Sequence, residues 1–378
     1  MLFVPLTSVV VLSLLYWVAD YFPGAGIDGS VIFHLRVGLE GAGFKEYTLL
    51  MMSVVLLSGG WLAGFILLLR RCWSRDGRRS VVLSGAVLSL LAVAANPASH
   101  DLYRLYAPQP GRAMTTPETG VASHYINRPK VTSTAEPPAN LVYIYAESLE
   151  ETYFDENLFP GLLPNLKALR EQGLVFEDVS QVSNSGWTIA GMVASQCGLP
   201  LFMSGGGNSL SGMTDFMAGA TCMGDILRQQ GYFLSYMGGA STQFAGKGNF
   251  YRSHGFHKVQ GLEELQDKQI DSAYQSSWGI YDDELFEFAR EELAALQQKD
   301  SPFGLFLLTL DTHHPRGHLS KSCQGLKYPH QDNPMLDAVH CADRILATFI
   351  RDIQRQGLTD NTLIVLGSDH TAMKNTVY

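Results

Sequence analysis

Three apolar stretches of the sequence are each followed directly by side chains that ligate metal ions or bind phosphate. These side chains are Glu147 after "NLVYIYA", Asp311, His313 and His314 after "LFLLTL", and Asp369 and His370 after "LIVLGS". One such group alone is more often a helix cap or a surface residue, but its recurrence at three strand ends favours a shared site. Carboxylate oxygens with an imidazole suit Mn²⁺, Zn²⁺ or Mg²⁺ better than a thiol-loving ion.

A hydroxyl nucleophile for such a site is available at Thr188. It follows a Ser-Gly turn in "NSGWTIAGMVASQCG" and opens an apolar helix. At that position the hydroxyl can reach a metal, while the helix N-terminus offers backbone N–H groups to an anion. A hydroxyl is a weak nucleophile until a base or a metal lowers its pKa. The local sequence leaves an alternative open, in which Thr188 is only the N-cap of this helix.

These groups need a fold that brings the strand ends together. Strands are expected in "NLVYIYAESLE", "GYFLSYMGG", "PFGLFLLTLDTHHP" and "TLIVLGSDH", and helices in "LPNLKALREQG", "TIAGMVASQCG", "TCMGDILRQQG", "DDELFEFAREELAALQQK" and "LDAVHCADRILATFIRDIQRQG". This alternation predicts an α/β domain with a mostly parallel sheet covered on both faces. Ligands bind at the carboxyl ends of the strands in such sheets.

Three uncharged stretches, residues 2–19, 47–69 and 80–99, precede this domain. Each is close to the ~20 apolar residues that cross a bilayer, so three transmembrane helices are expected. A buried core helix or a signal peptide is the alternative for one of them. Cytoplasmic loops are rich in Lys and Arg, and the basic loop "RRCWSRDGRR" after the second stretch is therefore expected inside. Everything after Ser99 is then expected outside.

The remaining chain divides by composition. Residues 100–140 are proline-rich and polar and are expected to form a periplasmic linker, and residues 141–378 form the globular domain. The formal net charge of −9 argues against nucleic acid as a partner, because nucleic-acid binding needs a basic surface.

The exported part contains four cysteines, Cys197, Cys222, Cys323 and Cys341. An even number in an exported domain suggests two disulfides, and the shortest loops pair the first two and the last two. Three pairings are possible, and buried free thiols are a further alternative.

Several segments together resemble a known family. They are "NLVYIYAESLE", "WTIAGMVASQCGLPLF", "FAGKGNFYRSHGF", "WGIYDDELF", "LTLDTHHP" and "VLGSDHTAMKNT". This pattern is similar to the phosphoglycerol transferases of osmoregulated periplasmic glucan synthesis, which belong with lipoteichoic acid synthases and phosphoethanolamine transferases. The resemblance implies an alkaline phosphatase or sulfatase-like fold and extends from the N-terminal segment to the last residue.

Carried over residue by residue, the resemblance implies a role for each candidate. Glu147, Asp369 and His370 match the metal ligands, and Thr188 matches the nucleophile, itself a metal ligand. His313 matches the substrate-contacting histidine, and "GGASTQFAGKGN" corresponds to the headgroup-binding segment, in which Phe244 is expected to pack against the headgroup and Lys247 to contact a phosphate. His314, beside His313, is either a further contact or a surface residue. The segment "GGASTQFAGKGN" lacks the Trp and Arg of the lipoteichoic acid synthases.

The resemblance also implies a reaction and its partners. Thr188 attacks the phosphorus of phosphatidylglycerol, diacylglycerol departs, and a hydroxyl of a periplasmic glucan takes the phosphoglycerol group from the threonine. The cation expected is Mn²⁺, with Mg²⁺ or Zn²⁺ as alternatives. The protein is expected in the bilayer of the bacterial inner membrane, multi-pass, with the catalytic domain in the periplasm.

Other functions remain open at this level. A sulfatase needs Cys or Ser in a C/S-x-P-x-R pattern, whereas Cys197 lies in "CGLPL". A phosphoethanolamine transferase, a related phosphodiesterase, and a tethered binding or sensory domain share the same core. The chain ends at Tyr378, soon after His370, so a domain truncated at its C-terminus is expected, with an inactive membrane-tethered fragment as an alternative. The chain also starts one span short of the family's arrangement.

Overall fold

The computed structural model describes most of the chain. The described residues are 3–21, 26–27, 31–32, 48–72, 87–106, 125, 129, 131, 138–182, 185–201, 215–269, 271–373 and 377. The chain divides into two compact units, one containing Met1–Leu35 and Gly43–Ser123 and the other containing His124–Tyr378.

The first unit contains long apolar helices at two of the three predicted spans. Helix α1 covers Phe3–Tyr21 and α3 covers Thr48–Cys72. In the third stretch, residues 87–94 are helical, and α5 then begins at Pro97 and continues to Tyr106. The chain turns between them at Asn96, whose side chain accepts from Ala98 N at 3.0 Å and donates to Ser13 Oγ at 2.8 Å.

Across the described residues, no helix has both the length and the hydrophobicity of a membrane span. Residues 80–86, the basic loop after Cys72 and most of residues 107–137 lie outside the described residues. Helix α5 crosses the predicted domain boundary at residue 100.

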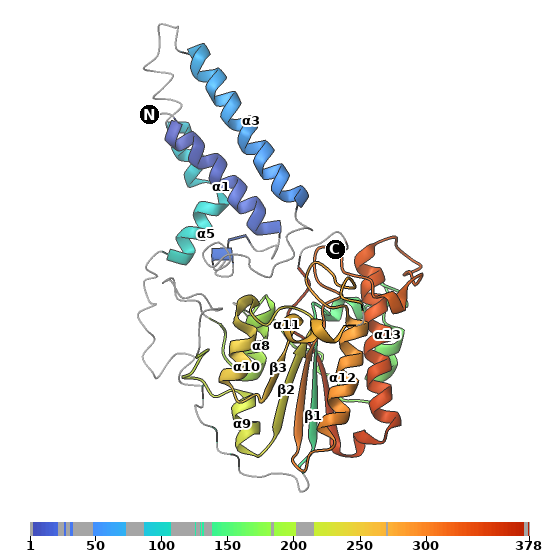
Figure 1. The fold of residues 1–378 in the computed structure, drawn as a ribbon. Helices are drawn as coiled ribbons and strands as arrows, with labels where there is room; N and C mark the ends of the chain where they lie inside the picture. Colours follow the sequence, from blue (N-terminus) through green and yellow to red (C-terminus); the bar gives the residue numbers. More distant parts are fainter. Residues whose placement is uncertain are drawn as a thin grey trace. The chain divides into compact units, whose positions relative to one another are not determined.

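The second unit is built on a five-stranded sheet in the order β3-β2-β4-β1-β5 (Figure 1). All its described pairings are parallel. The strands are β1 Asn140–Ala146, β2 Phe233–Gly238, β3 Lys258–Gln260, β4 Phe303–Leu308 and β5 Thr362–Ser368. The predicted α/β fold with a parallel sheet is confirmed, and β3 is a short strand that the sequence pattern did not indicate.

Helices alternate with these strands, as predicted. They are α7 Pro164–Arg170, α8 Thr188–Cys197, α9 Met223–Gln229, α10 Lys247–Ser253, α11 Leu262–Leu265, α12 Asp282–Leu296 and α13 Pro334–Arg355. Local signals explain their limits: α8 ends at Gly198, which is left-handed (φ 66°), and the Asn333 side chain caps the start of α13 by accepting from Met335 N at 2.9 Å. Such caps satisfy backbone groups that the helix itself leaves unpaired.

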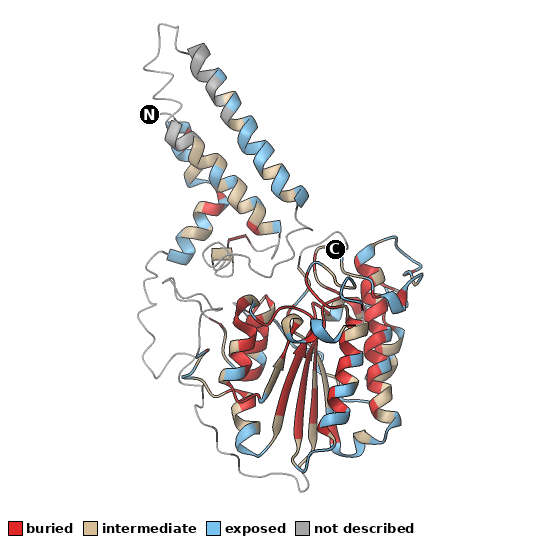
Figure 2. Ribbon diagram, viewed as in Figure 1, coloured by how far each residue is buried: buried red, intermediate tan, exposed pale blue. Residues whose placement is uncertain are grey.

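The central strands are buried on both faces of the sheet (Figure 2), whereas the edge strand β5 is mostly only partly buried and exposes Leu363. Val142, Ile144, Leu305 and Leu307 belong to one core cluster with apolar residues of α12 and α13. Neighbouring residues point to the opposite face, where Phe306 packs against Phe256 with ring centroids 4.9 Å apart. This two-sided burial explains the unbroken apolar runs, since strands of a covered parallel sheet have no solvent face.

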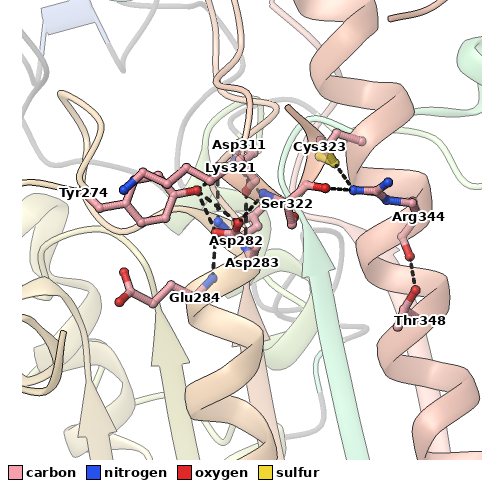
Figure 3. Close-up of a disulfide and its surroundings, with 12 residues drawn as sticks. Tyr274, Asp282, Asp283, Glu284, Asp311, Lys321, Ser322, Cys323, Arg344 and Thr348 are labelled. Atoms are coloured by element: carbon pink, nitrogen blue, oxygen red, sulfur yellow. Dashed lines mark hydrogen bonds between the residues drawn. A yellow bond between two sulfur atoms is a disulfide. The ribbon is translucent and has the colours of Figure 1, made fainter. Parts of the chain in front are cut away.

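The four cysteines form two disulfides, Cys197–Cys222 and Cys323–Cys341. The predicted shortest-loop pairing is therefore confirmed, and the alternative of free thiols is wrong. The first links the end of α8 to the residue that caps α9. The second attaches the segment after β4 to α13, where Arg344 also donates to the Ser322 carbonyl and to Cys323 Sγ (Figure 3).

Removal of the second disulfide is expected to destabilise the domain. The double substitution Cys323→Ser and Cys341→Ser opens a loop with a sequence separation of 18 residues, which in the chain-entropy model lowers the free energy of unfolding by about 3 kcal/mol. Urea unfolding of the variant and the wild type measures this difference. A difference below about 1 kcal/mol would contradict a stabilising role for this bond.

Candidate active site

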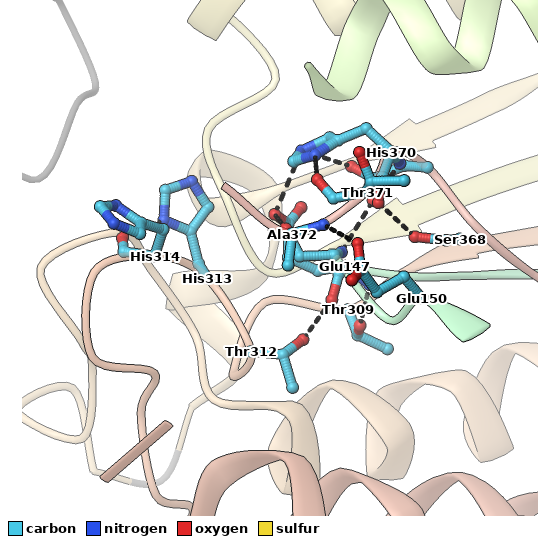
Figure 4. Close-up of polar contacts among 12 residues, drawn as sticks. Glu147, Glu150, Thr309, Thr312, His313, His314, Ser368, His370, Thr371 and Ala372 are labelled. Atoms are coloured by element: carbon cyan, nitrogen blue, oxygen red, sulfur yellow. Dashed lines mark hydrogen bonds and ion pairs between the residues drawn. The ribbon is translucent and has the colours of Figure 1, made fainter. Parts of the chain in front are cut away.

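The register of two neighbouring strands places three potential metal ligands side by side. In the β1–β5 pair, Ala146 lies opposite Ser368, so the next residues along the two strands, Glu147 and Asp369, lie at the same sheet edge. His370 follows at once, and all three side chains are buried. Their candidate ligand atoms all lie within 4.8 Å of one another. Figure 4 shows Glu147 and His370 in this cluster.

Hydrogen bonds fix the orientation of the three side chains. Ser148 donates from its backbone N to Asp369 Oδ1 at 3.0 Å and from its hydroxyl to Glu147 Oε1 at 2.9 Å. His370 donates from Nδ1 to the carbonyl of Thr371 at 2.7 Å, which turns its Nε2 toward the carboxylates. A backbone partner of this kind is a common way to orient a metal-binding imidazole.

The remaining atoms of the cluster fit a divalent cation. His370 Nε2 lies 3.4 Å from both Glu147 Oε1 and Asp369 Oδ2. Among the described residues, Asp369 Oδ2 is buried and has no hydrogen-bond donor. A buried carboxylate oxygen without a partner is unfavourable unless a cation or a proton balances it. Two carboxylates and one imidazole therefore form a suitable donor set for Mn²⁺, Mg²⁺ or Zn²⁺.

Electrostatics within the cluster lead to the same conclusion. Burial, reinforced by the charge of Glu147, raises the pKa of Asp369 to about 7. Burial disfavours the His370 imidazolium, but Asp369 and Glu147 outweigh this effect and raise its pKa to about 10. Burial likewise opposes ionisation of Glu147, yet the nearby His370 lowers the pKa of Glu147 overall. In the metal-free protein, a proton on His370 thus supplies the positive charge that a cation would otherwise supply.

Metal binding is consequently expected to depend on pH. The pKa of His370 is about 10, so at neutral pH its proton must leave when a cation binds, and apparent affinity should rise about tenfold per pH unit from pH 7 to 9. Titration calorimetry with Zn²⁺ in buffers of different ionisation enthalpy measures the protons released. We expect about one proton per cation at pH 8. Binding without proton release would contradict coordination by His370 Nε2.

Thr188 begins the helix that packs onto this cluster. It is half-buried, and it is the first residue of α8, whereas Trp187 is the N-cap. The alternative that Thr188 is only the N-cap is therefore wrong. One turn later, a Cβ atom placed on Gly191 would lie 1.7 Å from the Asp369 carbonyl oxygen. Glycine at that position lets the first turn of α8 lie directly against the backbone of a predicted metal ligand.

His313 lies after β4 on the same edge of the sheet. In Figure 4 its ring lies between His314 and the Glu147–His370 cluster. Its Nδ1 donates to the His314 carbonyl at 2.7 Å, so Nε2 is the nitrogen available for proton transfer. Burial lowers the pKa of His313, and the charge of Glu147 opposes this only in part. The neutral imidazole therefore suits the role of a base better than that of an acid.

Lys247 and Phe244 lie after β2. Lys247 is only 3% exposed, and its Nζ lies 5.1 Å from the centre of the Phe244 ring. Burial lowers the pKa of Lys247 to about 8, and Glu147, Asp369 and Glu263 oppose this shift. The amine is thus mostly charged at pH 7, and among the described residues no carboxylate lies within 4.0 Å of it. A buried cation of this kind is suited to hold an anion.

One group at the second strand end does not belong to the cluster. Asp311 and Asp282 bond reciprocally: Asp282 Oδ2 accepts from Asp311 N at 3.1 Å, and Asp311 Oδ1 accepts from Asp282 N at 3.2 Å. Burial raises the pKa of both carboxyls, that of Asp282 to about 7. The pair joins the end of β4 to the start of α12. Asp311 is therefore a structural residue, contrary to its grouping with the metal and phosphate ligands.

The sequence pattern missed several residues that build the site. Thr309 Oγ1 accepts from the backbone N of Glu147 at 2.9 Å, and Ser148 bridges two predicted ligands. Trp278 packs against His313, with ring centroids 4.1 Å apart. "WGIYDDELF" carried part of the family resemblance, but neither spacing nor periodicity connects its tryptophan with His313, which lies 35 residues later in the numbering.

Comparison with known proteins gives matches over nearly the whole chain. The family model described as Sulfatase matches residues 139–377, and the one described as Phosphoglycerol transferase I, N-terminal domain, matches residues 1–116. Phosphoglycerol transferase I of Xanthomonas axonopodis pv. citri is 39% identical over 380 residues, covering 98% of this chain and 52% of that protein. The Salmonella arizonae enzyme of the same name is 38% identical over 371 residues, covering 98% of this chain and 48% of that protein.

A solved structure agrees at the level of the fold. A protein of the alkaline phosphatase superfamily from Vibrio parahaemolyticus superposes with a TM-score of 0.51 and 24% identity, covering 62% of this chain and 55% of that one. The chain spans about half the length of the curated relatives that it matches. It is a homologue of phosphoglycerol transferase I. Because the sulfatase model covers more than half of its residues, the chain belongs to the sulfatase family.

Proposed function

We propose that this protein transfers phosphoglycerol from phosphatidylglycerol to a periplasmic glucan through a covalent intermediate on Thr188. One observation carries the proposal: the β1–β5 register brings Glu147 and Asp369 together, and Gly191 allows the first turn of α8 to pack against Asp369. The position of Thr188 at the start of α8 and the electrostatic interaction of buried Lys247 with Glu147 and Asp369 support the same proposal. The homology to phosphoglycerol transferase I supports the choice of donor and acceptor.

The reaction takes place in two displacements at phosphorus. Thr188 Oγ forms a bond to phosphorus while the bond to the diacylglycerol oxygen breaks, and the threonine proton goes to the departing alkoxide. The glucan hydroxyl then attacks from the vacated side and gives its proton to His313 Nε2. The bond between phosphorus and Thr188 Oγ breaks, and Thr188 Oγ takes the proton back from His313, so both side chains return to their starting state. A divalent cation held by Glu147, Asp369, His370 and Thr188, with Mn²⁺ the first choice, would activate the threonine and neutralise phosphoryl charge.

Membrane attachment is part of the same proposal, because the donor is a lipid. Helices α1 and α3 coincide with two of the predicted spans. Helix α3 exposes a run of large apolar side chains, namely Leu49, Met51, Met52, Val55, Leu56 and Leu57. Contiguous exposed apolar surface is characteristic of contact with a membrane or a partner. We propose that the first unit anchors the catalytic domain at the periplasmic face of a bacterial inner membrane.

A related phosphoethanolamine transferase is the main alternative, and Lys247 argues against it. Lys247 is buried without a carboxylate within 4.0 Å among the described residues, and it contacts the Phe244 ring. A fixed positive charge repels the ammonium of an ethanolamine headgroup but tolerates neutral glycerol. His314 is also buried, on the same loop as His313, and is proposed as a further substrate contact.

The proposal is tested by detection of the intermediate. The purified chain, in detergent with Mn²⁺, is incubated with phosphatidylglycerol or, separately, phosphatidylethanolamine, and then analysed by intact mass and peptide mapping. We expect a phosphoglycerol adduct on Thr188, release of diacylglycerol, and a lower yield with the ethanolamine lipid. A full-length curated relative, run in parallel, establishes that the assay detects an adduct. An adduct on another residue, or none, would refute the mechanism for this chain.

A further inference from the structure

Trp278 carries a polar group that the protein itself does not satisfy. The side chain is 8% exposed, and its indole Nε1 is buried and has no hydrogen-bond partner among the described residues. Buried tryptophan N–H groups usually have a partner, because burial removes the water that would otherwise accept the hydrogen bond. An unpaired donor of this kind at the edge of a proposed active site indicates a ligand atom.

The neighbours of Trp278 are the side chains proposed to contact the donor headgroup. Its ring lies 4.1 Å from the His313 ring and 5.7 Å from the Phe244 ring, measured between centroids. The Phe244 ring in turn lies beneath Lys247 Nζ. His313 and Phe244 are both partly exposed, so a headgroup can contact either ring. Because both rings are direct neighbours of the indole, that headgroup would lie close to Trp278.

The backbone of Trp278 is held firmly in place. Ser276 Oγ accepts from the backbone N of Trp278 at 3.1 Å and from that of Gly279 at 3.2 Å. Gly279 forms an isolated bridge with Ala240, just after β2, and a Cβ on Gly279 would lie 2.1 Å from the Gly239 carbonyl oxygen. These contacts fix the indole relative to the carboxyl end of the sheet, as recognition of a small group requires.

We propose that the Trp278 indole N–H donates a hydrogen bond to a hydroxyl of the donor's glycerol headgroup and thereby determines specificity for a polyol. This inference rests on the proposed function. A neutral N–H matches an uncharged hydroxyl, whereas Lys247 and the cation site match the phosphoryl charge. A site that pairs a buried donor with a substrate hydroxyl discriminates strongly against an analogue without it, since the donor is then left unpaired.

The direct test observes the indole proton. Indole ¹⁵N–¹H spectra of the full chain in detergent with Mg²⁺ are recorded during titration with glycerol 1-phosphate and, separately, with propyl phosphate, which has no free hydroxyl. Loss of one resonance in Trp278→Phe assigns the signal. We expect a downfield shift of the Trp278 N–H with glycerol 1-phosphate only. No shift with glycerol 1-phosphate, or an equal shift with propyl phosphate, would overturn the inference.

A kinetic comparison separates this inference from the proposed function. Adduct formation is measured with phosphatidylglycerol and with phosphatidylpropanol in wild type, in Trp278→Phe, and in a variant with benzothienylalanine at position 278, which retains the ring shape but lacks the N–H. In both variants we expect kcat/KM for phosphatidylglycerol to fall about tenfold relative to wild type, and kcat/KM for phosphatidylpropanol not to fall. An equal fall for both lipids would show a merely structural role. If wild type forms no adduct, the proposed function fails, while the spectra still decide the role of Trp278.

Discussion

We expect Thr188→Ala to form no covalent adduct with phosphatidylglycerol and to lower turnover by about 10⁴-fold or more. The substitution removes the protein atom proposed to form a bond to phosphorus, whereas the cluster of Glu147, Asp369 and His370 remains. Thr188 is half-buried on the first turn of α8, and alanine is a good helix former there. The fold should therefore be preserved. Intact mass and diacylglycerol release measure the outcome.

Two matched variants sharpen this prediction. Thr188→Ser retains a hydroxyl at the same position and should still form the adduct, at a rate within about tenfold of the wild type. Thr348→Ala removes an exposed hydroxyl of α13, bonded to the Arg344 carbonyl at 2.7 Å, and should change nothing. If Thr188→Ala still accumulated an adduct, the nucleophile would be another residue. If Thr188→Ala turned over normally, and neither this variant nor the wild type formed an adduct, the acceptor would attack the lipid directly.

Gly191→Ala is expected to have the second largest effect, although it touches no substrate. Its Cβ would lie 1.7 Å from the carbonyl oxygen of Asp369 and 3.4 Å from that of Ser185, so α8 must move away from the metal cluster. A displacement of about 1 Å at a nucleophile costs about 100-fold in rate, and the forced overpacking costs about 1–3 kcal/mol in stability. We expect slower adduct formation together with weaker cation binding.

The control for this prediction is the same substitution at a site with room for it. At Gly173, after α7, the nearest atom to a new Cβ is the Leu169 carbonyl oxygen at 3.9 Å. Gly173→Ala should therefore leave adduct formation and cation affinity unchanged. Urea unfolding, calorimetry and the adduct assay are applied to both variants. Equal behaviour of the two glycines would mean that contact between α8 and Asp369 does not position Thr188.

Much of the fold follows from local patterns in the sequence. The apolar runs before Glu147 and Asp369 are long enough and rich enough in β-branched and aromatic residues to predict β1 and β5. The run "TIAGMVASQCG" predicts α8 and its end at a glycine. The short strand β3 was missed because its three residues, Lys258–Gln260, are too few to show a periodicity.

The chemistry of individual side chains also limits what the site does. Two carboxylates, an imidazole and a hydroxyl at strand and helix ends predict a cation-assisted displacement, because those donor atoms suit hard divalent cations. The family resemblance adds phosphatidylglycerol as the expected donor. It also suggests a role for each candidate residue, although it does not distinguish an acid from a base at His313.

Other features depended on contacts between distant segments. Asp311 has the same kind of position as Glu147 and Asp369, yet it pairs with Asp282, since α12 begins beside the end of β4. The charge state of His313 depends on burial, which the sequence does not show. Trp278 reaches the site only because the segment after Ser276 folds back onto the turn that follows β2.

Local periodicity, side-chain chemistry and loop length are enough to predict most of the strands and helices of the domain and the residue types of its site, and to favour the disulfide pairing that the structure has. Which strand ends meet depends on the tertiary structure. Strand order and register place Glu147 beside Asp369, Gly191 brings α8 against them, and an unpaired indole N–H lies beside His313. Such close approaches depend on the packing of the whole sheet with its helices, which no single segment encodes.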